Sequence, residues 1–227
     1  QVRSTGLLIG LAACVGGALM AHAAHKHPQH KRPQSGRGMP ARPVQAHLEA
    51  ARTFNRSSAL LALSVLADSG IEHYRGAFAN KAMYTPFVTS ALALAAGLHG
   101  GADARARTHL ARHAIYLAAG AAGLSGAGFH VYNIMKRPGG WSWNNLFYSA
   151  PLGAPIALVL SGALGAVAER LREQPSTEPR LLGMQAGRAL GLVAAAGLVG
   201  TVGEVALLHF RGSFQNPVMY APVTIPP

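Results

Sequence analysis

Long apolar stretches recur along this chain and alternate with short loops rich in Arg, Lys, His, Gly and Pro. Half of the residues are hydrophobic and only 12% are charged, whereas soluble domains carry roughly 25% charged residues. About 20 consecutive apolar residues suffice for a helix to cross a bilayer. The sequence therefore predicts an all-α, polytopic integral membrane protein with about six transmembrane helices. These helices are expected over residues 5–24, 57–73, 87–98, 110–132, 151–168 and 182–208.

Small residues indicate how these helices pack. Glycine and alanine let helix backbones approach closely in lipid, where packing rather than hydrophobicity drives association. Gly120, Gly123, Gly126 and Gly128 are expected to give the helix over 110–132 a face that packs against a neighbour.

Two segments that lie far apart in the chain share one unusual pattern. Residues 73–86 and 209–222 both read H-[YF]-R-G-[AS]-F-x-N-x-x-M-Y-x-P, and an acid stands five positions before each His. These acids are Asp68 and Glu204. We call the two copies the outer motif segments. Residues 130–151 form a divergent middle segment, which keeps the His, Asn, Tyr and Pro but lacks the Arg-Gly pair.

The recurrence predicts a repeated unit of helix, motif loop and a second helix opened by proline, because proline suits the first helical turn. Membrane proteins often arise by such duplication. By analogy with Pro86, Pro222 is expected to open a seventh helix, whose continuation the sequence leaves open. We divide the chain into residues 1–24, an N-terminal transmembrane helix; 25–56, a basic His/Pro-rich loop with a short interfacial helix over 44–54; 57–100, the first hairpin; 107–172, a divergent second hairpin; and 182–227, an incomplete third hairpin.

Charge distribution predicts the orientation in the membrane. Loops 25–57, 100–113 and 169–188 hold 14 of the 20 Lys and Arg residues. The positive-inside rule places these loops in the cytoplasm and the motif loops on the non-cytoplasmic face, in our expectation of a bacterial inner membrane. Residues 5–24 also have the features of an uncleaved signal anchor, which would place 25–57 outside instead. Because the basic residues follow this loop pattern, the net charge of +12 does not indicate nucleic-acid binding.

Several residue types of the motif are expected to shape the loop rather than to carry chemistry. Gly76 and Gly212 are expected to adopt a positive φ where the chain leaves the helix. The motif Asn residues are expected to cap or turn the loop. The motif Phe and Met side chains should pack the loop into the helix bundle. Arg75 and Arg211 are expected to reach lipid phosphates or an acid of a neighbouring repeat.

The rest of the motif suggests chemistry. Ionisable residues inside transmembrane helices are costly and usually paired or functional, which makes Asp68, Glu72 and Glu204 candidates for handling protons. An acid five residues before a His is a poor partner within one helix, so we expect pairing between repeats. The candidate cofactor-binding residues are His73, His130, His209, Arg75, Arg211, Tyr84 and Tyr220. Histidines at helix ends can ligate haem b. Histidine, arginine, acid and tyrosine together can line a quinone pocket, and three histidines can bind zinc or copper.

Three functional hypotheses follow. The first is a membrane subunit of a multi-subunit, redox or electron-transport complex, which anchors partner subunits through the motif loops and contributes a quinone or haem site. The second is a small proton- or cation-coupled transporter that uses Asp68 and Glu204. The third is a structural scaffold in the bilayer. No P-loop, GxGxxG, GxSxG or CxxCH pattern is present, and the sequence leaves open whether the chain is an enzyme.

Overall fold

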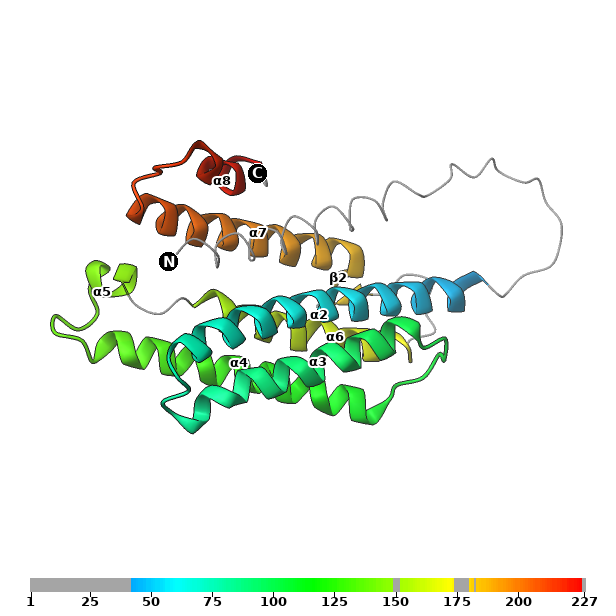
Figure 1. The fold of residues 1–227 in the computed structure, drawn as a ribbon. Helices are drawn as coiled ribbons and strands as arrows, with labels where there is room; N and C mark the ends of the chain where they lie inside the picture. Colours follow the sequence, from blue (N-terminus) through cyan, green and yellow to red (C-terminus); the bar gives the residue numbers. More distant parts are fainter. Residues whose placement is uncertain (1–41, 149–151, 174–179, 182, 226–227) are drawn as a thin grey trace.

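The computed structural model describes residues 42–148, 152–173, 180–181 and 183–225 (Figure 1). The predicted helix over 5–24 and the His/Pro-rich loop up to residue 41 lie outside these residues. The fold is all-α, as predicted, apart from one two-stranded hairpin of β1 (Arg180–Leu181) and β2 (Met184–Gln185). The long helices are α2 (Arg42–Arg75), α3 (Tyr84–Ala102), α4 (Leu110–Met135), α6 (Gly153–Leu171) and α7 (Ala186–Arg211). The short ones are η1 (Lys81–Met83), α5 (Trp143–Tyr148), η2 (Pro217–Tyr220) and α8 (Ala221–Thr224).

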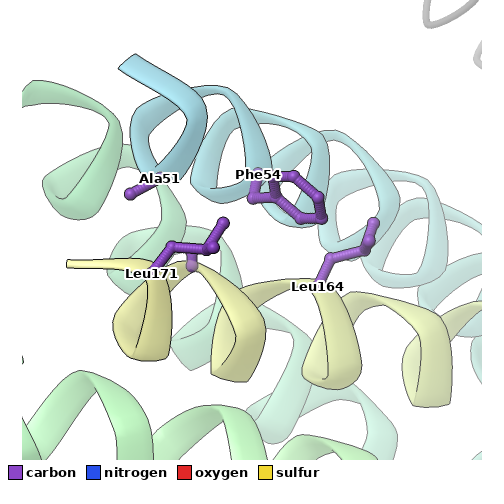
Figure 2. Close-up of a cluster of buried hydrophobic side chains, with 5 residues drawn as sticks. Ala51, Phe54, Leu164 and Leu171 are labelled. Carbon is purple, nitrogen blue, oxygen red and sulfur yellow. The ribbon is translucent and has the colours of Figure 1, made fainter. Parts of the chain in front are cut away.

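Helices α2, α3, α4 and α6 pack together as a four-helix bundle, and α7 lies along one edge of it beside α6 (Figure 1). One buried cluster joins α2 to α6, where Ala51 and Phe54 face Leu164 and Leu171 (Figure 2). A second buried cluster draws on all four helices of the bundle. The core therefore sits between these four helices, and α7 contributes little to it.

Glycine lets α4 and α6 approach closely, as expected for helices that associate in lipid. A Cβ added at Gly162 would lie 2.5 Å from the carbonyl oxygen of Tyr116, and one at Gly123 would lie 2.7 Å from that of Pro155. Gly128 does not belong to the helix–helix contact predicted from sequence, because a Cβ there would meet no atom within 4 Å. Only part of the predicted glycine face is thus an interface.

The structure has three helices that are long and apolar enough to cross a membrane, within the part of the chain that it describes. They are Leu110–Met135, Gly153–Leu171 and Gly187–Arg211. Helices α2 and α3 do not reach the same measure, because α2 carries several charged groups and α3 includes polar residues at both ends. The three apolar helices indicate membrane association, while the predicted number of about six spans is not confirmed.

Helix α2 is longer than the sequence suggests. The pattern predicts an interfacial helix over 44–54 and a separate helix from Ser57, yet 34 residues form one helix, about 50 Å long. Buried polar groups explain the continuity. The Asn55 side-chain oxygen accepts a hydrogen bond from the Tyr116 hydroxyl, and its nitrogen donates to the Ala51 carbonyl at 3.0 Å. A polar residue satisfied in this way does not interrupt a helix.

The helices run so that the two outer motif segments and the middle segment all lie at one end of the molecule (Figure 1). We call this the motif end. The α3–α4 loop and the end of α6 lie at the opposite end (Figure 1). Pro86 falls in the first turn of α3, which begins at Tyr84, and Pro222 lies in α8.

Candidate functional site

The two outer motif segments form the same loop, held by the same hydrogen bond. The Nδ1 atom of His73 lies 2.7 Å from the carbonyl oxygen of Met83, and Nδ1 of His209 lies 2.6 Å from that of Met219. A carbonyl oxygen only accepts hydrogen bonds, so Nδ1 donates in both rings. This fixes the tautomer of each neutral imidazole and leaves Nε2 with a lone pair for a proton or a ligand.

The chain leaves α2 and α7 through one type of turn. The amide of Phe78 donates to the carbonyl of His73 at 3.0 Å, and that of Phe214 donates to His209 at 3.1 Å. These bonds are those of a Schellman turn. The sequence prediction placed the positive φ on Gly76 and Gly212, but the structure places it on the next two residues. Gly212 has a φ of −84°.

The motif glycines serve close packing instead. A Cβ added at Gly76 would lie 3.1 Å from the terminal methyl of Met83, and one at Gly212 would lie 3.3 Å from that of Met219. The terminal methyl of each methionine therefore packs against the glycine of its own loop.

Aromatic stacking and an asparagine cap complete each loop. The rings of Phe78 and Tyr84 stack with centroids 4.4 Å apart, as do those of Phe214 and Tyr220. The phenylalanine thus packs on the tyrosine of its own loop. The side-chain oxygen of Asn80 accepts the amide of Ala82 at 2.9 Å, in the capping role predicted from sequence. Asn216 makes the matching bond to Val218 at 3.0 Å. Tyr84 and Tyr220, predicted as cofactor-binding residues, each use one ring face in this stacking.

The two motif arginines differ in their contacts. Arg75 forms an exposed ion pair of 2.9 Å with Glu72 one turn back in α2, and not with an acid of another repeat. Arg211 lies over the ring of Tyr148, 4.6 Å from its centroid. This contact joins the third loop to the middle segment and is of the cation–π type.

The middle segment does not reproduce the outer loops. His130 lies five residues before the end of α4, whereas His73 lies two residues before the end of α2. Asn145 is buried inside α5 and donates to the carbonyls of Pro138 at 3.1 Å and Gly140 at 2.8 Å. Asn145 thus closes a loop through its amide nitrogen, whereas Asn80 caps through its oxygen. Without the Arg-Gly pair, the same His and Asn are built into a different structure.

The two acids of the outer repeats, Asp68 and Glu204, lie within electrostatic range of each other. Asp68 of α2 is buried, and Glu204 of α7 lies within electrostatic range of it. The Glu204 carboxylate accepts a hydrogen bond from the amide of Gly153, where α6 begins. This is the favoured end of a helix for a negative group. We call Asp68 and Glu204 the acid pair. Pairing between repeats was expected from sequence, but with a histidine as the partner rather than a second acid.

Neither member of the acid pair forms an ion pair with a basic side chain among the described residues. Asp68 also lies within electrostatic range of Glu72 and His73, which lead toward the motif end. The structure therefore brings Asp68, Glu72, His73 and Glu204 into one neighbourhood. It does not bring His73, His130 and His209 into one metal site, because no group of three suitable ligands occurs in the residues that the structure describes.

The opposite end of the bundle holds a buried ionic cluster that sequence reasoning missed. Both Nε and Nη2 of Arg112 donate to the Glu169 carboxylate, at 2.9 and 3.1 Å, and Nη1 donates to Asp103 at 2.7 Å. Arg172 lies 3.5 Å from the same Glu169 carboxylate. We call these four residues the ionic cluster.

The cluster fixes the α3–α4 loop. Arg172 donates to the backbone carbonyls of Gly100 at 2.7 Å, Asp103 at 3.2 Å and Arg105 at 2.6 Å. Burial alone would raise the pKa of Asp103, but the hydrogen bond and charge of Arg112 outweigh it and lower that pKa to about 2. A sequence signal existed, namely an Arg in the first turn of one apolar helix and a Glu in the last turn of another.

No family model matches the chain, and searches of curated proteins and of solved structures found no match either.

Proposed function

We propose that this chain is a membrane protein that takes up and releases a proton, or a small cation, at the acid pair of Asp68 and Glu204. The observation that carries the proposal is that Glu204, held at the first residue of α6, lies within electrostatic range of the buried Asp68 from another repeat. Buried charges in membrane proteins mark ion and proton pathways when they face a bundle interior.

The chemistry follows because no basic side chain of the described residues forms an ion pair with either carboxylate. Two neighbouring carboxylates in an apolar surrounding cannot both carry a full charge without cost, and such pairs commonly share one proton. The amide of Gly153 stabilises negative charge on Glu204. Among the described residues, no backbone amide donates a hydrogen bond to the Asp68 carboxylate, which makes Asp68 the member suited to exchange the proton or to face a bound cation.

A route to the surface runs along α2. His73 and Glu72 follow Asp68 by about one turn, and the Glu72 side chain is 36% exposed. The Nδ1–H of His73 is engaged with Met83, so a proton enters and leaves the ring at Nε2 without opening the loop. His73 can thus pass a proton between the motif end and Asp68 while it keeps its structural bond.

The test uses the full chain reconstituted in liposomes with a pH-sensitive dye inside. An imposed pH gradient or potential should drive proton movement that Asp68→Asn and Glu204→Gln each reduce at least about tenfold, because each removes one titrating group from the pair. Glu49→Gln is the matched control, since Glu49 is an exposed acid on the same helix. Equal fluxes in all variants would refute the proposal.

A second candidate is a subunit of a redox complex with a haem or quinone site at the motif end. The observation that favours it is the fixed tautomer of His73 and His209, which presents Nε2 in the manner of a metal-bound histidine. The motif end also exposes large aromatic side chains, among them Tyr74, Trp141, Trp143 and Phe210. Such residues suit a lipid interface or a partner subunit.

A reduced-minus-oxidised spectrum of protein purified in mild detergent separates the candidates. A haem signal that is lost in both His73→Ala and His209→Ala would favour the redox subunit. Cross-links from the motif loops to a second, identified polypeptide would favour partner docking. If the protein shows neither a haem signal nor proton flux, and the histidine variants behave like the unchanged protein, the hypothesis of a structural scaffold in the bilayer is favoured.

A further inference from the structure

A pocket of about 350 Å³ lies beside the α3–α4 loop at the opposite end from the motif. Its walls include Arg105, Arg107, Thr108, His109 and Leu110. Neither Arg105 nor Arg107 uses its guanidinium in an ion pair or hydrogen bond among the described residues. Asp103, the acid in the wall, is already held by Arg112. The pocket is therefore lined by two arginines whose charge no ion pair of the described residues neutralises.

Hydrogen bonds from the ionic cluster fix the backbone that carries these arginines. Arg172 donates to the carbonyls of Asp103 and Arg105, and the Asp103 carboxylate accepts the amide of Arg105 at 3.0 Å. The Glu169 carboxylate also accepts the amide of His109 at 2.8 Å. Because the buried ionic cluster orders this loop, an anion that enters the pocket does not have to order it.

An apolar stripe begins at the pocket and follows α4. Leu110, Leu117 and Leu124 are seven residues apart, so they lie on one line of the helix, and their exposed fractions are 81%, 55% and 65%. Seven residues are almost two helical turns. Helix α4 is one of the three helices that can span a membrane. The pocket and the stripe together form a surface with a cationic head and a long apolar tail.

We propose that this surface binds one anionic phospholipid, with the phosphate at Arg105 and Arg107 and an acyl chain along the leucine stripe. Charge complementarity selects the head group, and the adjoining stripe selects an amphiphile over a free anion. Arginine suits phosphate because its guanidinium donates two parallel hydrogen bonds. The site lies on the basic face, where the positive-inside rule predicts the cytoplasmic leaflet with its anionic lipids. This inference is independent of proton uptake at the acid pair.

Native mass spectrometry of the full chain in detergent tests the site. Dioleoyl phosphatidylglycerol is titrated against dioleoyl phosphatidylcholine. The first phosphatidylglycerol should be retained about tenfold more strongly, because each basic residue near an anionic head group adds several-fold to affinity. The variant Arg105→Gln/Arg107→Gln should lose this preference. The control Arg180→Gln/Arg188→Gln removes the same charge from exposed arginines outside the pocket and should keep it.

A second set of measurements tests whether the site binds the whole lipid or only a free phosphate. The variant Leu117→Gln/Leu124→Gln should weaken phosphatidylglycerol retention several-fold, and circular dichroism checks that its helix content is unchanged. Millimolar inorganic phosphate should not displace the lipid. Full displacement by phosphate would assign a free-anion site and overturn the proposal. Equal retention of both lipids, or an unchanged preference without Arg105 and Arg107, would overturn it as well.

Discussion

Replacing Glu169 by Gln should destabilise the bundle more than any exposed charge change. The Glu169 carboxylate is fully buried and accepts two bonds from Arg112, at 2.9 and 3.1 Å, and one from the amide of His109 at 2.8 Å. Without its charge, the buried guanidinium groups of Arg112 and Arg172 face Asp103 alone. Removing one partner of a buried ion pair costs about 3–5 kcal/mol, a large share of a typical total stability of about 5–15 kcal/mol.

Loss of helix signal in circular dichroism, as sodium dodecyl sulfate is titrated into protein in mild detergent, measures the free energy of unfolding. The control is Glu72→Gln, which breaks an exposed pair with Arg75 of the same 2.9 Å length. It should cost less than about 1 kcal/mol, because solvent screens exposed pairs. If the two variants lose the same free energy of unfolding to within about 0.5 kcal/mol, the argument that burial determines the cost of losing a charge is wrong.

Two further outcomes follow from the same bundle. Asp103 has its folded pKa lowered from 3.8 to about 2, so its native contacts, chiefly those with Arg112, contribute at most about 2.5 kcal/mol well above pH 4. That contribution should be lost as pH falls from about 4 to about 2, and acid titration of Asp103→Asn should lack this loss. Gly162→Ala should destabilise by about 1–3 kcal/mol, because its Cβ would lie 2.5 Å from the Tyr116 carbonyl. Gly200→Ala, whose Cβ meets nothing within 4 Å, should be neutral or up to about 1 kcal/mol stabilising, as thermal unfolding of the pair will measure.

The sequence predicts the helical class and the position of the loops because both depend on local signals. Apolar stretches define helices, and the Asn-to-Pro spacing locates the start of α3, with Asn80 capping η1 as expected. The internal match also singles out Asp68 and Glu204. The proximity of Asp68 to Glu204 depends on how α7 sits against α6, which no local pattern specifies. The prediction of a positive φ at Gly76 was wrong for a similar reason. Glycine is suited to this position because the Met83 methyl packs against it, and not because the backbone needs a positive φ there.

The ionic cluster escaped sequence reasoning for a different reason. Arg112 and Glu169 are 57 residues apart, and each stands in a loop-adjacent position where a charge usually faces solvent. Their burial depends on how α4 and α6 pack against each other, which a local sequence pattern does not specify. The sequence assigned the interesting chemistry to the motif end, while the structure adds a charged centre at the other end that anchors the loop of the proposed lipid site.

The outer motif loops hold Ala77, Phe78, Ser213 and Phe214 at positive φ, where glycine would be easier. Such a turn persists only when its surroundings over-determine it. Histidine, phenylalanine, asparagine, methionine and tyrosine each supply one contact to the loop, so a single substitution weakens the support of all the others. A loop of this kind changes as a whole or not at all. The two outer copies keep the full residue pattern and the same loop, whereas the middle segment, which lacks the Arg-Gly pair, uses its Asn145 to close a different loop.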